Sequence, residues 1–328
     1  MKRVFALLVC FLLLTGCGRT AGEKRDDDPQ KLHIVTTIFP AYDFARSVAG
    51  DWAEVTLLLP PGTESHSYEP TPSDILKVQD CDLFFYLGGE TDSWVDTILT
   101  AVEPKGETMR MVDCVPLLEE AELNGADHRG HDHEEHDGHD HDHGREDGLG
   151  TITGMDEHVW TSPENAAVIV RKVGEQLAAL DAEHAADYRA NAESYAARID
   201  ELDADFEAFF ESLQDDTIVF GDRFPLLYFA EHYDLDYYAA FSACSTQTEP
   251  SAATIAFLTE KVRKENIPTV WYIEFSNHLV ADCIAEAAEV KTAMFHTCHN
   301  VSKADISSGA TYVSLMQTNL ETMKANMQ

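Results

Sequence analysis

Short apolar runs alternate with helical patterns along the first third of the chain. The runs at residues 33–39 (HIVTTIF), 55–59, 82–88 (DLFFYLG) and 109–112 predict strands, and the segments at 41–49, 72–80 and 94–102 predict helices, with Ser73 capping the second helix. The uninterrupted run at 82–88 is typical of a strand buried on both faces. This alternation predicts a parallel sheet with helices on its faces.

The middle of the chain follows a helical period instead. Residues 163–180 predict one helix, and a longer helix follows, whose apolar positions recur in steps of three and four over 26 residues, about 39 Å at 1.5 Å per residue. Such spacing also suits a coiled coil, but only about three and a half heptads are present. We therefore expect a helix that packs along two lobes of its own chain. Its stripe consists of Tyr188, Ala192, Tyr195, Ile199, Leu202, Phe206, Phe209 and Leu213.

The last third returns to alternation. Residues 217–222, 237–241, 269–274 and 292–297 predict strands, and 251–265 (with Ser251 as cap) and 312–324 predict helices. We predict an α/β fold of two Rossmann-like lobes with parallel sheets, joined by one long backbone helix. The N-terminal lobe would span 31–162, the linker helices 163–215 and the C-terminal lobe 216–328.

The first 17 residues have the pattern of an export signal. Lys2 and Arg3 precede an apolar stretch at 4–14 that is too short to span a bilayer, and Leu-Thr-Gly-Cys at 14–17 follows. This ending resembles the bacterial lipoprotein cleavage box, which predicts lipid on Cys17 and a polar tether at 18–30. The alternative is a signal that is uncleaved or cleaved without lipidation. We expect an extracytoplasmic protein, anchored by lipid to the outer face of the cytoplasmic membrane or on the periplasmic side.

Charge excludes one class of partner. Among 328 residues, 59 are Asp or Glu and 23 are Lys or Arg, a formal net charge of −36, so no basic patch is available to neutralise the phosphates of a nucleic acid. The charge suits a protein that handles cations, although a strongly acidic surface is more often simply a soluble one.

A histidine-rich loop at 126–147 interrupts the first lobe. It lacks the apolar residues needed for a core, and such tracts commonly bind metal, loosely, because ordering a flexible chain costs free energy. The alternatives are a solvated spacer or a tag, and a tag is disfavoured in mid-chain among acidic residues. The seven candidate accessory metal ligands are His128, His131, His133, His136, His139, His141 and His143.

Five cysteines follow Cys17. An exported protein allows disulfides, but an odd number leaves at least one thiol free, or none of the five is paired. Cys244 and Cys298 each come just after a predicted strand and are the favoured pair. Thiolate ligation of a metal is the competing interpretation, without CxxC spacing to support it.

Several ligand-capable residues follow predicted strands. In open α/β sheets ligands bind beyond the carboxyl ends of the strands, so a gap between the lobes would bring these residues together. Nitrogen and oxygen ligands from separate loops suit Zn²⁺ or Mn²⁺. The candidates are His66, His158, Asp222, His296 and His299, whereas His33, His184, His232 and His278 are interpreted as structural.

Three motifs carry a resemblance that extends over essentially the whole mature chain. The segments PGTESHSYEPTPSD, DEHVWTSPENA and TEPS resemble the substrate-binding lipoproteins of metal-ion ABC importers, namely the high-affinity zinc-uptake proteins and their manganese relatives. The resemblance implies two α/β lobes, a rigid backbone helix and a metal in the cleft between the lobes. It also implies a histidine-rich loop ahead of the second metal histidine.

The resemblance assigns ligands residue by residue. His66 and His158 match the two ligands of the first lobe. In the second lobe, FGDRFPLLYF lacks the His or Glu of the family, Asp222 is the nearest ligand-capable residue, and the fourth position falls beside His299, with His296 nearby. More nitrogen favours Zn²⁺ over Mn²⁺. Glu249 and Glu274 match recurrent acidic positions and are interpreted as supporting groups rather than ligands.

The predicted function is capture of the ion and its delivery to a cognate ABC permease, by a monomer with no catalytic role. One alternative is an extracellular zinc hydrolase, but HEEH at 133–136 lacks the HExxH spacing and no GxSxG motif occurs. Another is a surface adhesin or metal buffer in which the histidine-rich loop is the main functional part. No GxxxxGK[ST] phosphate loop is present, so the ATPase would be another protein.

Overall fold

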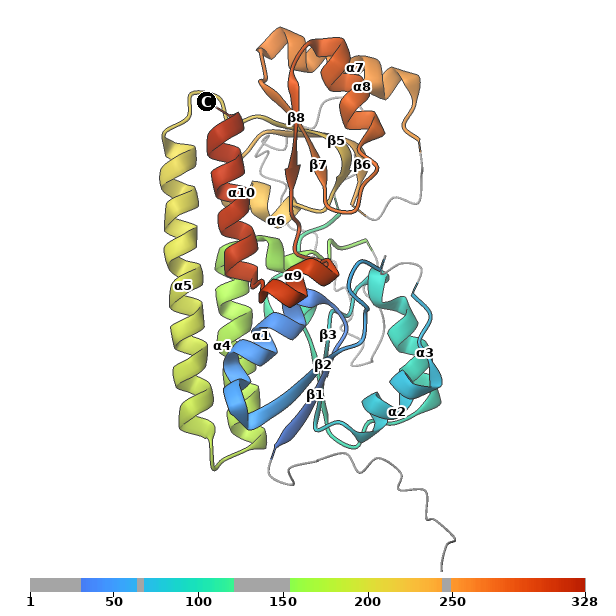
Figure 1. Cartoon of the computed structure of the whole chain (residues 1–328), viewed down its shortest axis with the longest axis vertical. Helices are drawn as coiled ribbons and strands as arrows, with labels where there is room; N and C mark the ends of the chain where they lie inside the picture. The colour runs from blue at the N-terminus through green and yellow to red at the C-terminus, as the bar shows by residue number, and fades with distance from the viewer. Residues whose placement is uncertain (1–30, 64–67, 121–153, 244–248, 328) are drawn as a thin grey trace, which may run out of the picture. The chain divides into compact units, whose positions relative to one another are not determined.

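Two four-stranded parallel sheets with the same strand order organise the chain, which confirms the predicted α/β fold (Figure 1). The computed structural model describes residues 31–63, 68–120, 154–243 and 249–327. The orders are β2-β1-β3-β4 and β6-β5-β7-β8, so the first strand of each sheet lies between the second and the third. The strand order therefore reverses direction at β1 in the first sheet and at β5 in the second. Open α/β sheets bind ligands at such a reversal, beyond the carboxyl ends of the strands.

The first sheet is covered by helices that begin where the sequence predicts them to within two residues. Its elements are β1 (Leu32–Thr36), α1 (Phe39–Ala49), β2 (Ala53–Leu57), α2 (Pro72–Asp80), β3 (Leu83–Tyr86), α3 (Ser93–Ala101) and β4 (Glu107–Arg110). All four residues of β3 are buried, as the uninterrupted apolar run predicts.

Two local predictions in this half are wrong. The cap of α2 is Thr71, not Ser73, because Pro72 already occupies the first turn, and Thr71 and Asp74 form a reciprocal capping box. The fourth strand ends at Arg110 rather than Val112, since Val112 begins the short 3-10 helix η4 (Val112–Cys114).

The middle of the chain forms two long helices that lie side by side, α4 (Pro163–Leu180) and α5 (Ala185–Glu211) (Figure 1). The predicted apolar stripe is buried from Tyr188 to Phe209, and Leu213 lies beyond the end of the helix. Gly174 lets the two helices approach, because a Cβ at this position would lie 2.5 Å from the Cβ of Ala192. The stripe packs inside one chain, as predicted, rather than in a coiled coil.

The second half of the chain again alternates strands and helices, and its last helix packs against helices of the preceding parts. Ser251 caps α7 as predicted, by accepting a hydrogen bond from the backbone of Thr254. The C-terminal helix α10 lies against α5 and α1 (Figure 1). The elements are β5 (Ile218–Phe224), α6 (Leu227–His232), β6 (Tyr237–Ser242), α7 (Ala252–Glu265), β7 (Thr269–Ile273), α8 (Leu279–Ala288), β8 (Lys291–Phe295), α9 (Lys303–Ser308) and α10 (Tyr312–Asn326).

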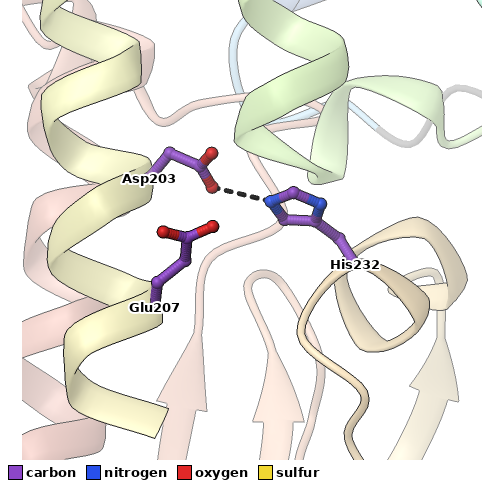
Figure 2. Close-up of side chains that lie close together, drawn as sticks. All are labelled: Asp203, Glu207 and His232. Carbon is purple, nitrogen blue, oxygen red and sulfur yellow. Dashed lines mark hydrogen bonds and ion pairs between the residues drawn. The ribbon is translucent and has the colours of Figure 1, made fainter. Parts of the chain in front are cut away.

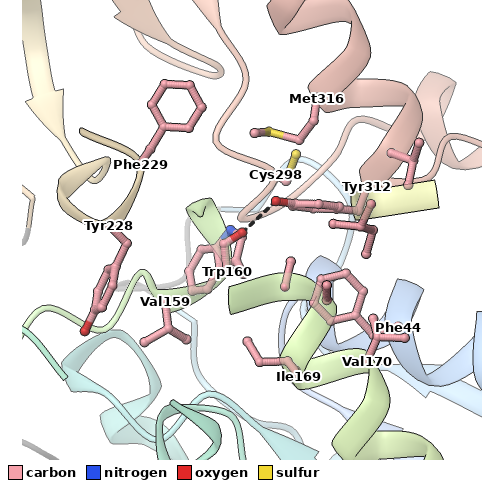
Figure 3. Close-up of a cluster of buried hydrophobic side chains, with 14 of the residues drawn as sticks. Phe44, Val159, Trp160, Ile169, Val170, Tyr228, Phe229, Cys298, Tyr312 and Met316 are labelled. Atoms are coloured by element: carbon pink, nitrogen blue, oxygen red, sulfur yellow. Dashed lines mark hydrogen bonds between the residues drawn. The ribbon is translucent and has the colours of Figure 1, made fainter. Parts of the chain in front are cut away.

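Buried aromatic contacts connect the segment after β4 with the segment after β8 (Figure 3). The indole Nε1 of Trp160 donates to the carbonyl of Thr297 at 2.9 Å, and the hydroxyl of Tyr312 donates to the carbonyl of Trp160 at 2.8 Å. Phe44 meets Tyr312 edge to face. Each buried hydrogen bond contributes about 1 kcal/mol net and would cost more if one partner were lost. These contacts fix His158 and His299, which flank them in sequence.

None of the helices in the described ranges is both long and apolar enough to span a bilayer.

Candidate metal centre

A cavity of about 440 Å³ lies at the carboxyl ends of strands from both sheets. Three of the predicted ligands, His158, Asp222 and His299, line it together. Other residues of its wall come from the loop after β2, from β5 and from the turns after β7 and β8, namely Gly62, Thr63, Arg223, Glu274, Ser276, Asn277, Thr297 and Asn300.

His158 is held by the carboxylate of Asp156. The residue is only 3% exposed and stands immediately before the 3-10 helix η5 (Val159–Thr161). Asp156 Oδ1 lies 2.7 Å from the backbone nitrogen of His158 and 3.0 Å from its Nδ1. A proton on Nδ1 directed at this carboxylate leaves Nε2 as the nitrogen for a metal, and such pairing increases the basicity of a histidine ligand.

The same carboxylate controls the proton affinity of the ring. Burial alone would lower the pKa of His158, but the charge of Asp156 and its hydrogen bond outweigh burial and raise the pKa above the ordinary 6.5. A cation that binds Nε2 therefore competes with a proton that the site itself favours.

His299 brings a second imidazole to the same wall. Its ring centroid lies 6.0 Å from that of His158, and both rings contact the indole of Trp160, with centroid distances of 5.3 and 5.4 Å. The backbone carbonyl of His299 accepts from Phe39 at 3.1 Å, at the start of α1. Two imidazoles far apart in sequence therefore meet beside one cavity.

Glu274 supports the turn that carries His299. Both of its oxygens accept from Thr297, one from the backbone nitrogen at 2.8 Å and one from the hydroxyl at 2.5 Å. The hydroxyl of Thr297 in turn accepts from the backbone nitrogen of His299 at 3.2 Å. A buried carboxylate thus positions the histidine through one intervening residue.

His296 is engaged inside this turn rather than at the cavity wall. Its Nδ1 accepts from the backbone nitrogen of Cys298 at 3.0 Å, so a neutral ring carries its proton on Nε2. In this arrangement Nδ1 is occupied, and His296 is not among the residues that line the cavity. Cys298 has a positive φ of 64°, and its thiol is buried, which raises the thiol pKa well above its ordinary value.

Asp222 reaches the wall from an irregular part of β5. The pairing register with β6 shifts between Phe220 and Arg223, and such irregularities re-aim side chains beside functional sites. Oδ1 of Asp222 accepts from the backbone of Arg223 at 2.8 Å and Oδ2 from that of Ile273 at 3.3 Å. Arg223, which cannot bind metal, lines the cavity beside it.

Several predicted residues lie outside the described ranges: Cys17, His66, Cys244 and all seven histidines of the 126–147 loop. Thr63, three residues before His66, lines the cavity. Cys298 is a free thiol, which disagrees with the predicted disulfide, although its predicted partner Cys244 is among the undescribed residues.

The histidines interpreted as structural each face a carboxylate and do not line the cavity. His184 lies 2.7 Å from Asp181, and His278 lies 2.8 Å from Asp282. His33 is 3.8 Å from Glu54, and His232 is 2.8 Å from Asp203.

Sequence reasoning missed Asp156 and Thr297. Asp156 stands two residues before His158 in the DEH motif, and this nearby carboxylate was a usable signal. Thr297 carries no sequence signal for its bond to Glu274.

The family model described as zinc-uptake complex component A, periplasmic, matches residues 34–326. The chain is 33% identical to the zinc-binding lipoprotein AdcA of Streptococcus pneumoniae (strain ATCC BAA-255 / R6), over 99% of this chain and 61% of that protein. It is 30% identical to the high-affinity zinc uptake system protein ZnuA of Bacillus subtilis (strain 168), over 99% of this chain and 97% of that one. The chain thus spans less than two thirds of the length of AdcA.

Solved structures share the fold. The crystal structure of the Zn(II)-bound ZnuA-like domain of Streptococcus pneumoniae AdcA has a TM-score of 0.70 at 29% identity, covering 90% of this chain and 99% of the other. The metal-dependent lipoprotein YcdH from Bacillus subtilis has a TM-score of 0.72 at 26% identity, covering 91% and 100%.

Proposed function

Because the chain belongs to the family of periplasmic zinc-uptake proteins, as its motifs predicted, we propose that it captures Zn²⁺ outside the cytoplasm and delivers it to an ABC-type importer. The observation that carries this proposal is the pair His158 and His299, two imidazoles from distant segments that line one cavity with carboxylates. The relatives named zinc-binding and zinc-uptake proteins support zinc as the cargo. The role is binding and transfer rather than catalysis.

The proposed ligand set has three imidazoles and one carboxylate. His158 offers Nε2 and His299 offers a ring nitrogen. His66 lies outside the described ranges and is the third imidazole of the proposal, because Thr63, three residues before it in sequence, lines the cavity. Asp222 is the proposed carboxylate, because within the described residues each of its oxygens accepts one hydrogen bond and retains a lone pair for a metal. Nitrogen-rich coordination with one carboxylate suits Zn²⁺ better than Mn²⁺.

The geometry supports selective capture through preorganisation. Asp156 fixes the ring of His158, and the path from Glu274 through Thr297 fixes His299, so little ordering is needed when the ion enters. The ligands replace the water that the ion loses. The cavity lining also contains Asp222 and Glu274 together with the positive Arg223, which limits the net negative charge that the cavity presents.

The remaining parts of the chain have proposed supporting roles. Lipid on Cys17 and the tether at 18–30 would hold a monomer at the outer face of the cytoplasmic membrane, next to the permease. Residues 31–162 and 216–328 form the lobes in this proposal, and 163–215 form the helical linker. The histidine-rich stretch at 126–147 is proposed to collect ions loosely and raise their local concentration.

Zinc titration of the protein against a chelator of known affinity tests the proposal. We expect one tight site, weakened more than about 100-fold by His158→Ala and by His299→Ala, because loss of even a group that only orients a ligand costs about 10–100-fold. His278→Ala is the matched control, since this exposed imidazole pairs with Asp282 and does not line the cavity. Wild-type affinity in both cavity variants would refute the ligand assignment.

Deletion of residues 127–147 separates capture from storage. A transport protein keeps its tight site and loses only weak zinc binding, because the proposed ligands lie outside the deleted stretch. Loss of the tight site on deletion would favour a metal buffer instead.

A further inference from the structure

Three side chains with metal-binding groups converge between α5 and α6, away from the residues that line the cavity (Figure 2). Asp203 and Glu207 stand one turn apart on α5 and therefore share a face of that helix. His232 is the last residue of α6 and faces both carboxylates. One ligand atom from each of the three lies within 4.8 Å of the others.

Neighbouring groups already orient this cluster. His232 Nε2 lies 2.8 Å from Asp203 Oδ1, and its Nδ1 lies 3.3 Å from Glu164 Oε2 in the first turn of α4. The hydroxyl of Tyr233 donates to Asp203 Oδ1 at 2.6 Å. A histidine whose far nitrogen faces a carboxylate, opposite a second carboxylate, is the arrangement in which histidine ligands of metals are commonly held.

The charges at this position are unbalanced. Three carboxylates surround one imidazole, and no lysine or arginine of the described ranges forms an ion pair with Asp203, Glu207 or Glu164. Even a protonated imidazole would leave an excess of negative charge. The side chains of His232 and Asp203 are 17% and 18% exposed, and Glu207 is exposed, so a hydrated ion can reach them.

We propose that Asp203, Glu207 and His232 form a second divalent-cation site, one that binds Zn²⁺ with modest affinity. One imidazole nitrogen and two carboxylates, with water as the fourth ligand, form a donor set that zinc accepts. Tetrahedral bonds of about 2.0–2.2 Å place donor atoms roughly 3.3–3.6 Å apart, so the exposed Glu207 needs only a small movement to close the site. Glu164 and Tyr233 orient the ligands without binding the ion.

A cation here would link three helices of the chain. It would connect α6, which follows the first strand of the second sheet, to α5, and through Glu164 to the start of α4. The site is independent of the proposed transport function, since it shares no residue with the cavity lining or with the proposed ligand set.

The test is a zinc titration of the purified protein, followed by the histidine side-chain resonances in two-dimensional NMR. The His232 signals are assigned by their absence in His232→Gln. We expect Zn²⁺ to shift them, and Glu207→Gln to raise the zinc concentration required at least tenfold. Glu164→Gln should weaken binding by about 10–100-fold, as loss of a group that orients a ligand does.

Asp205→Asn is the matched control, because Asp205 is an exposed acid two residues from both carboxylate ligands and points to another face of α5. It should titrate like the wild type. The proposal is overturned if the His232 signals stay unmoved when zinc is raised far beyond the concentration that saturates the His158 and His299 signals, or if Glu207→Gln titrates like the control. Failure of the cavity site would appear in the His158 and His299 signals instead, so the two proposals are judged separately.

Discussion

Asp156 Oδ1 contacts His158 twice, at the backbone nitrogen and at ring Nδ1, in a pair that is almost completely buried. This relationship makes Asp156 the residue that fixes which nitrogen faces the cation. We predict that Asp156→Asn lowers zinc affinity by about 10–100-fold while His158 stays in place, because an amide orients the ring less strongly and does not raise its basicity. Competition against a zinc chelator measures the change.

The control for this prediction is Asp181→Asn. Asp181 also holds a histidine, His184, with an Oδ2–Nδ1 distance of 2.7 Å, but neither residue lines the cavity. Equal losses of zinc affinity in the two variants would contradict the assigned role of Asp156.

Zinc affinity should fall on acidification, starting above pH 6.5. The sign follows from proton competition: Asp156 raises the pKa of His158, so at any given pH a larger fraction of the ring is protonated than in an ordinary histidine, and a protonated ring cannot bind zinc. In Asp156→Asn the decline should move to lower pH, although affinity at alkaline pH is reduced. Zinc titrations from pH 5.5 to 8.5 measure both curves, and coincident pH profiles for the two proteins would refute this account.

Asp43 joins α1 to α5 and to α10. Its buried carboxylate accepts from Arg46 at 2.7 Å, from the hydroxyl of Tyr195 on α5, and from the backbone of Tyr312 on α10 at 2.8 Å. Asp43→Ala leaves these donors unsatisfied and should lower the free energy of unfolding by about 3–5 kcal/mol, measured by urea denaturation.

The comparison variant for Asp43 is Asp80→Ala. Asp80 forms an ion pair of 2.6 Å with Lys105, but both side chains are at least half exposed, so the change should cost less than about 1 kcal/mol. Similar losses of unfolding free energy in the two variants would show that the buried network around Asp43 stabilises the protein no more than an exposed ion pair does.

The close approach of α4 and α5 depends on Gly174. Gly174→Ala places a Cβ about where the Cβ of Ala192 requires space, 2.5 Å away, and should destabilise the protein by about 1–3 kcal/mol despite the better helix propensity of alanine. Ala192→Gly in the same chain should restore part of this loss, because it vacates the space. Thermal unfolding of the two single variants and the double variant forms a cycle, and strict additivity would exclude direct contact.

Element order, and most boundaries to within two residues, could be predicted from the sequence. The 3.6-residue period of α5 and the apolar run of β3 are local patterns, and burial in the structure follows them. The misplaced cap of α2 shows the limit of such patterns, because Thr71, Ser73 and the intervening Pro72 all fit a helix start, and only backbone geometry selects Thr71.

The sequence by itself determined the fold class, the family motifs and a set of candidate ligands that includes His158, Asp222 and His299. The tertiary structure decided which of them share a wall, because that depends on the packing of Trp160 and Tyr312 between segments more than a hundred residues apart. It also turned His296 into a hydrogen-bond acceptor for Cys298 and placed His232, which sequence analysis interpreted as structural, opposite two carboxylates of α5. Hydrophobic periodicity acts along the chain, whereas the approach of His158 to His299 and of His232 to Asp203 joins residues that only folding brings near.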